Sequence, residues 1–179
     1  MKSILKALGL GTTTETAPER STETVRKIVS ELEAMEPARA RYVAAFAYIL
    51  GRVAHADLDI SEHETHKMEE IVHGLGHLPE DQSVLVVQIA KSQNRLFGGT
   101  ENFLVTREFV EISSLEQRQE LLDCLFAISA ADRSISGVEE AQIRQIASEL
   151  GFSHSDYVAA RSVYNEHREV LKPLLGDES

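Results

Sequence analysis

Two short acidic motifs of the same pattern contain the residues of this sequence whose types and spacing could bind a ligand. Residues 56–64 read ADLDISEHE (the first turn motif) and residues 131–139 read ADRSISGVE (the second turn motif), so both follow A-D-x-x-I-S-x-x-E. The carboxylates are Asp57 and Glu64 in the first motif, and Asp132 and Glu139 in the second. Carboxylate oxygens are the ligands that calcium, magnesium and manganese prefer. If the motifs fold together, the four side chains could hold one divalent cation.

Part of the same pattern is ordinary helix capping. Ser61 with Glu64, and Ser136 with Glu139, have the spacing of a capping box, in which Ser accepts from the N–H three residues on and Glu reaches back to the Ser N–H. The aspartates fit less well, because each falls at the end of a predicted helix, where the helix dipole disfavours a carboxylate. Their partner is either a set of N–H groups in the turn, which would make the motif structural, or a metal ion shared with the Glu.

Neither motif is an EF-hand calcium loop. That loop has Gly at its sixth position and a bidentate Glu at its twelfth. Counted from Asp57, these positions hold Glu62 and Met68, and counted from Asp132 the twelfth position holds Ile143. A cation at these turns would therefore need a different arrangement of ligands.

A stripe of histidines on one predicted helix is a second group of candidate ligands: His63, His66, His73 and His77. Helical spacing places the apolar residues on the opposite face, which we expect to pack in the core: Met68, Ile71, Val72 and Leu75. The histidines should therefore be exposed to solvent. They are either an incidental polar face or a site for zinc, nickel or copper, which imidazole suits.

The sequence offers no catalytic constellation. Cys124 lies among apolar residues, which predicts a buried and unreactive thiol. No Gly-rich phosphate loop, G-x-S-x-G motif or H-E-x-x-H motif occurs. We therefore predict a protein that is not an enzyme.

Composition excludes several other classes of protein. The 179 residues carry 18 Lys and Arg against 29 Asp and Glu, a net charge of −11, whereas a nucleic-acid binder needs a basic face. A single cysteine forms no internal disulfide and no zinc site of several thiolates. No apolar run is long enough to span a bilayer. These features predict a cytoplasmic protein that binds no nucleic acid.

The elements that would position the two motifs are all helical. From Ser21 onward apolar residues recur every three or four positions, and Ser, Pro and Gly mark the boundaries. Helices are predicted over about residues 21–35, 37–56, 62–74, 79–97, 100–112, 115–131, 136–150 and 154–172, the last ending near Pro173. The predicted fold class is all-α, a compact bundle of seven to eight helices that contains two pseudo-repeated helix–turn–helix hairpins.

Two segments make up the predicted domain organisation: a flexible N-terminal segment, residues 1–20, and a helical domain, residues 21–179. Residues 1–11 (MKSILKALGLG) are basic and partly apolar, and they are followed by a polar linker. Ile4, Leu5 and Leu8 could line a membrane-surface helix beside its lysines. Otherwise the segment is a frayed terminus or docks on the body of the domain. Residues 1–11 are the one segment through which contact with a membrane is possible.

The doubled motif resembles the tellurite-resistance TerB-like family over roughly residues 42–164. The strings that carry the resemblance are RVAHADLDISEHE and, more specifically, ISAADRSISGVEEAQIRQIASELGFS, which continues into the I-A-x-x-L-G ending. The resemblance implies a compact helical domain with internal pseudo-symmetry, whose acidic residues cluster and bind a cation. Those residues correspond here to Asp57, Glu64, Asp132 and Glu139. Where the family usually has Gly after the motif Asp, this chain has Leu58 and Arg133, and Arg133 could neutralise its neighbour.

The resemblance also implies a role in a bacterial tellurite- or stress-resistance system. The expected function is a non-catalytic domain that binds calcium, magnesium or manganese at the two turns. The alternative is a protein-interaction scaffold with a purely structural motif, and a third reading is a metal-dependent hydrolase. Similar domains occur in membrane-anchored J-domain co-chaperones, but the His-Pro-Asp motif of those proteins is absent. A protein partner is expected, and its identity, the oligomeric state and the metal are left open.

Overall fold

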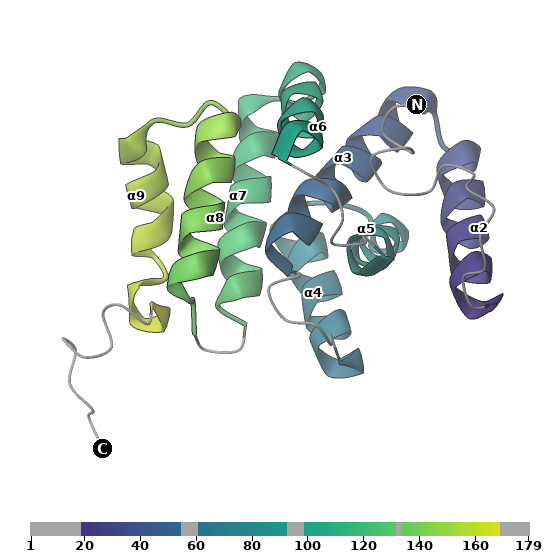
Figure 1. Cartoon of the computed structure of the whole chain (residues 1–179), viewed down its shortest axis with the longest axis horizontal. Coiled ribbons are helices and arrows are strands. Elements are labelled where there is room, and N and C mark those ends of the chain that lie inside the picture. The colour runs from purple at the N-terminus through teal and green to yellow at the C-terminus, as the bar shows by residue number, and fades with distance from the viewer. Residues whose placement is uncertain (1–18, 55–60, 93–98, 132–133, 169–179) are drawn as a thin grey trace.

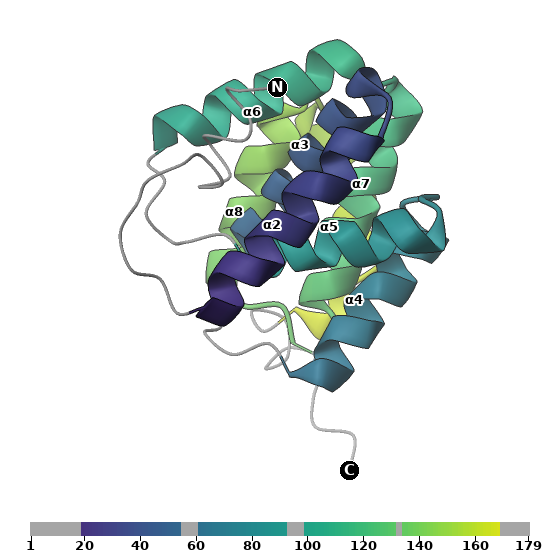
Figure 2. The ribbon, with the colours of Figure 1, turned by 90° about the vertical axis from the view of Figure 1, so that its right-hand side faces the viewer.

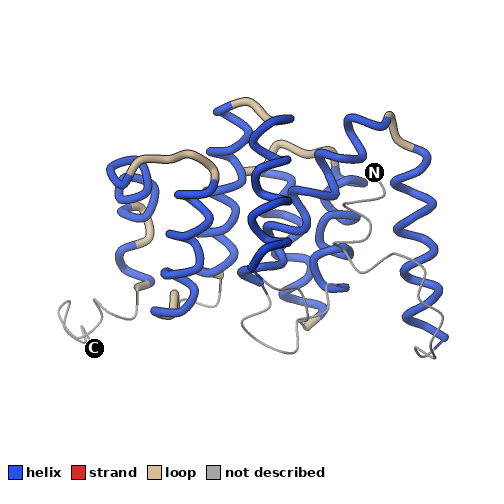
Figure 3. The backbone as a smooth tube through the Cα atoms, turned by 45° about the horizontal axis from the view of Figure 1, so that its top comes forward, coloured by secondary structure: helices blue, strands red, loops and turns tan. Residues whose placement is uncertain are grey.

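The regular structure of this chain is helical. The computed structural model describes residues 19–54, 61–92, 99–131 and 134–168, and within them Figure 3 shows helices and connecting loops without a strand. In chain order the helices are α2 (Glu19–Ala34), α3 (Pro37–Ala54), α4 (Glu62–Gly74), α5 (Glu80–Ser92), α6 (Gly99–Ile112), α7 (Leu115–Ser129), α8 (Gly137–Glu149), α9 (His154–Ser162) and a short 3-10 helix, Asn165–His167. The predicted all-α bundle of seven to eight helices is confirmed. The internal pseudo-repeat stays a prediction.

Helix α3 lies at the centre of the bundle. It packs against α2, α5, α6, α7 and α8, and every residue from Tyr42 to Gly51 is buried. The predicted inward face is buried as expected: Val43, Phe46, Ala47, Leu50 and Val53. Burial extends around the other sides because much of the helix is alanine or glycine, and side chains this small let neighbouring helices approach closely. The aromatic rings of Tyr42 and Phe46 pack with that of Phe109 on α6.

The remaining helices are arranged on two sides of α3. Figure 1 shows α7, α8 and α9 side by side at one end of the molecule, and these three helices contact one another. At the other end α2 packs on α5 and α3, and Figure 2 shows it crossing in front of α5. Helix α4 packs on α5 and α7. Helix α3 therefore lies between the two groups of helices and packs against both.

A buried ion pair joins three helices near the C-terminal end of α3. Nη1 of Arg52 donates to Oε2 of Glu149 on α8 at 2.6 Å and to Oγ1 of Thr106 on α6 at 2.9 Å. The two charged side chains are 3% and 11% exposed. Burial opposes ionisation of Glu149, but the hydrogen bonds and the positive charge of Arg52 outweigh it and hold the pKa of the carboxyl below its usual range. The pair is therefore charged at neutral pH.

Two glycines at matching positions of the repeated sequence are required for different reasons. Gly151 has a φ of +88°, the left-handed conformation that ends many helices and that glycine adopts without strain. Gly76 has no such φ, but a Cβ there would lie 2.5 Å from the carbonyl oxygen of Val72. In this loop the residue with positive φ is His77, at +48°. The sequence match at these two positions therefore does not extend to the backbone conformation.

Two predictions about the ends of helices are wrong. The last helix, α9, ends at Ser162 and is followed by the 3-10 helix, so it stops well before Pro173, which lies outside the described residues. Leu75, predicted to face the core, is 40% exposed. It is the C-cap of α4, where the chain leaves the helix, and the helical face defined by Met68 and Val72 no longer applies there.

Across the described residues, the structure contains no helix that is both long and apolar enough to cross a membrane.

We predict that Arg52→Ala lowers the free energy of unfolding by about 3 kcal/mol at pH 7, because it leaves the carboxylate of Glu149 buried without its cation. The folded-state pKa of Glu149 lies below its unfolded value, so the pair stabilises the protein above the unfolded pKa, and this stabilisation is lost as the pH falls through the folded-state pKa. The acid dependence of stability should therefore be weaker in the variant. Urea denaturation between pH 7 and pH 3 measures both effects.

Arg41→Ala is the matched control on the same helix. Arg41 pairs with Glu108 at 2.7 Å, but these side chains are 39% and 25% exposed, so the loss should stay below about 1 kcal/mol. Equal losses in the two variants would contradict the importance assigned to the buried pair.

Candidate functional site

Both turn motifs begin a helix with a complete capping box. At the start of α4, Ser61 Oγ accepts from the backbone N–H of Glu64 at 3.2 Å, and Glu64 Oε2 accepts from the backbone N–H of Ser61 at 2.6 Å. At the start of α8, Ser136 and Glu139 make the same pair of bonds, at 3.2 Å and 2.9 Å, and Ser136 Oγ also lies 2.7 Å from Glu139 Oε2. The predicted caps are confirmed. In each box the Glu uses Oε2, which leaves Oε1 outside the cap.

Capping boxes of this kind are not special to the two motifs. Helix α7 begins with a box made by Ser114 and Gln117, and α9 begins with one made by Ser153 and Asp156. In the α7 box a neutral amide oxygen accepts the bond that Glu accepts in the turn motifs. The Ser and Glu of the motifs are therefore explained by helix capping, while the negative charge of the Glu is not required by it.

Lys67 ties the two motifs to the same end of the bundle. In Figure 1, α4 and α8 both begin at the lower edge of the molecule. Lys67, in the second turn of α4, extends its ammonium to the backbone carbonyl of Ala131 at 2.5 Å. Ala131 is the first residue of the second turn motif and comes just after the end of α7. The beginnings of α4 and α8, which are far apart in the sequence, therefore lie at the same end of the bundle.

The two aspartates of the predicted cation site lie outside the described residues: Asp57 and Asp132. The structure therefore describes only the Glu half of the predicted set, Glu64 and Glu139, each in its cap. Within the described ranges no group of three or more His, Cys, Asp and Glu side chains is placed to hold a metal ion. The site of four carboxylates stays a prediction.

The histidine stripe is exposed, as predicted: His63, His66, His73 and His77. The rings are engaged separately. Nδ1 of His66 lies 3.1 Å from Glu69, Nδ1 of His73 donates to the carbonyl of Leu78 at 2.7 Å, and Nδ1 of His77 lies 2.8 Å from Glu120 on α7. Each of these three rings has its own hydrogen-bonding partner, so local contacts account for their positions without a shared metal ion.

Cys124 is fully buried, as predicted. Burial raises the pKa of its thiol, and the negative charges of Asp123 and Glu120 act in the same direction. A thiol with a raised pKa and no exposed surface is a poor nucleophile and a poor metal ligand.

A second ionic cluster, which sequence reasoning missed, fixes the second motif from the C-terminal side. Arg168, only 8% exposed, donates to Glu140 through Nε at 2.9 Å and through Nη2 at 2.8 Å, and Arg161 donates to the same carboxylate at 2.9 Å. The backbone N–H of Ile135 donates to the carbonyl of His167 at 2.6 Å. Sequence separation hides these contacts, because no periodic pattern relates Glu140 to an arginine twenty-eight positions later.

The capping geometry predicts that Ser136→Ala lowers the free energy of unfolding by about 1 kcal/mol, because a backbone N–H of α8 loses its acceptor. Ser148→Ala, an exposed position inside the same helix, should cause no loss, since alanine is the better helix former. Urea denaturation of both variants is the measurement. A Ser136 variant as stable as the wild type would contradict the assigned cap.

Comparison with known proteins identifies the family of this bundle. A family model described as tellurite resistance protein TerB matches residues 42–162, which begin in α3, include both turn motifs and end with α9. The comparisons with curated proteins and with solved structures gave no match. Because the family match covers more than half of the chain, this protein belongs to the TerB tellurite-resistance family.

Proposed function

We propose that this chain is a non-catalytic binding module of a bacterial tellurite- or stress-resistance system, and that its two turn motifs together bind one divalent cation. The ligands would be Asp57, Glu64, Asp132 and Glu139. The observation that carries the proposal is the contact of Lys67 with Ala131, because it brings the two acidic motifs to one end of the bundle.

The carboxylates of the two glutamates are suited to this double use. A carboxylate carries two oxygens and several lone pairs, so Oε2 can accept the capping bond while Oε1 coordinates a metal. Gln117 shows that an amide fills the same capping position in this chain. The ionised carboxylate also suits the positive N-terminal end of its helix, and its second oxygen leaves a position at which a cation could bind. Ligation by oxygen alone favours calcium, magnesium or manganese.

The same contact supports a second candidate function, a scaffold for a protein partner in which the acidic motif is structural. The ammonium of Lys67 already provides a positive charge at the C-terminal end of α7, where the helix dipole is negative. In this alternative Lys67 takes the place of the metal ion, and the net charge of −11 favours a partner with a basic surface. A metal-dependent hydrolase finds no support in the described residues.

Melting temperatures with and without cations test the proposal. Protein stripped of metal with a chelator should melt several degrees higher in millimolar calcium, magnesium or manganese, because an ion at about 100 times its Kd stabilises the native state by roughly 2.7 kcal/mol. Asp57→Asn combined with Asp132→Asn should abolish the response and leave the helical content unchanged.

A pair of variants separates charge from capping. Glu64→Gln with Glu139→Gln should keep both caps, as Gln117 does in α7, but should lose the cation response. Glu62→Gln, an exposed position next to the first cap, is the control and should respond like the wild type. If none of the three cations moves the melting temperature of the wild type, the scaffold function is the correct one.

A further inference from the structure

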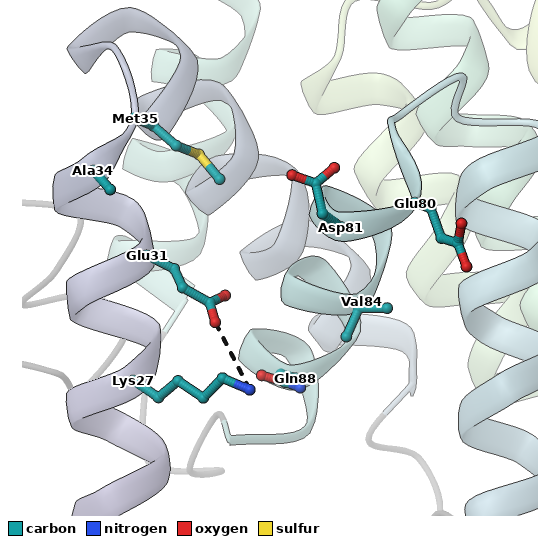
Figure 4. Close-up of a pocket in the computed structure, with 8 residues that line it drawn as sticks. All are labelled: Lys27, Glu31, Ala34, Met35, Glu80, Asp81, Val84 and Gln88. Atoms are coloured by element: carbon teal, nitrogen blue, oxygen red, sulfur yellow. Dashed lines mark ion pairs between the residues drawn. The ribbon is translucent and has the colours of Figure 1, made fainter.

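A groove of about 710 Å³ lies between α2 and α5 (Figure 4). These two helices lie on the opposite side of α3 from α8 and α9 (Figure 1). Met35, just after the end of α2, and Val84 on α5 contribute apolar side chains to its lining. Among the described residues that line it, the carboxylates are those of Glu31, Glu80 and Asp81, and the one ammonium is that of Lys27, which lies 3.8 Å from Glu31. The groove therefore combines apolar surface with a negative rim.

We propose that residues 1–11 of this chain dock in this groove as an amphipathic helix. The segment has the complementary chemistry: its charged side chains are Lys2 and Lys6, one turn apart, and it contains no acidic residue. Ile4, Leu5 and Leu8 share the other face of a helix with this sequence. An apolar stripe placed between two helices with lysines at an acidic rim is the usual way in which a groove binds a helix.

The reach of the chain permits this docking. The groove begins on α2 at Lys27, eight residues after the start of the helix at Glu19, and ends at Met35, so it lies about 12–24 Å from that start. Residues 12–18 connect the segment to α2, and seven residues extend to about 23–25 Å at most. A tether this short gives an effective concentration in roughly the millimolar range, so a weak contact is enough for docking.

Helix α2 has a reason to need this cover. Among its described side chains only Ile28 and Leu32 are buried, whereas α3 is buried on all sides. Of the apolar residues that line the groove on this side, Ala34 is exposed and Met35, just after the helix, is half-buried. A helix in the groove would bury more of the apolar surface shared by α2 and α5 and would hold α2 on the bundle.

Paramagnetic relaxation in the 179-residue chain tests the proposal. Ser3→Cys provides a single site for a nitroxide label, because the native Cys124 is fully buried. The amide signals of residues 27–35 and 80–88 should lose most of their intensity, and those of α8 and α9 should keep theirs. Uniform signals throughout the bundle would overturn the proposal.

Charge reversal provides the matched test. Lys2→Glu with Lys6→Glu should restore the lost signals, and adding Glu80→Lys with Asp81→Lys should remove them again. Glu111→Lys with Glu116→Lys makes the same change of charge at exposed positions on α6 and α7, and it should leave the groove signals at full intensity. If both pairs of charge reversals remove the groove signals, the effect depends on net charge and not on the groove, which would count against docking there.

Two other occupants give different results. In a second experiment, nitroxide-labelled chain is mixed with isotope-labelled chain that carries no nitroxide. If the groove signals broaden only in this mixture, the segment docks on a second copy. If it becomes immobile only on vesicles of phosphatidylglycerol, and the groove signals never change, it binds membranes. Either result overturns docking within one chain, and neither depends on whether the turn motifs bind a cation.

Discussion

The burial of α3 on all sides is the constraint on which the rest of this structure depends. A helix in this position must be narrow, and its alanines and Gly51 make it so. It must also pair the charge that it takes into the interior, since an unpaired charge there is costly. Arg52 carries the charge that α3 buries near its C-terminal end. Its bonds to Glu149 and Thr106 hold α8 and α6 against that end of the helix. Close packing and charge pairing therefore position the same helices.

Ionic contacts between distant segments then place the two turn motifs. Lys67 reaches from α4 to the end of α7, and Arg168 reaches from the C-terminal region back to Glu140 in the first turn of α8. The charged side chains that make these contacts lie outside the motifs: Lys67 bonds to Ala131, the first residue of the second motif, and Arg168 bonds to Glu140, the residue just after it. Arginine forms two bonds to one carboxylate in a fixed plane, so it orients the start of α8 more tightly than a single bond would.

Local patterns in the sequence predicted much of this fold, because helices and their caps are encoded by near neighbours. Ser136 and Glu139 lie three residues apart, and their spacing alone predicts a capping box. Apolar periodicity likewise predicted the buried face of α3. The same reasoning failed at Leu75, where the chain leaves the helix and periodicity no longer describes its direction.

The parts of the site that sequence could not predict depend on distance in space. Lys67 carries no mark that relates it to Ala131, because the bond requires α4 and α7 to be packed first. Gly76 and Gly151 match in sequence, yet one avoids a clash and the other adopts a left-handed conformation. Matching residues in the two motif regions therefore indicate where glycine is required, but they do not indicate which backbone conformation requires it.

The position of Cys124 has a consequence for how this protein withstands oxidation. It is the single cysteine of the chain, and it is withdrawn into the core beneath α4, where its Sγ lies 3.8 Å from the carbonyl oxygen of Ile71. Oxidants that convert exposed thiolates to sulfenic acids or mixed disulfides need both access to the sulfur and its ionised form. This fold withholds both as long as it is intact. In a cell whose small thiols have been consumed by such an oxidant, the thiol of Cys124 would stay reduced for as long as the fold holds.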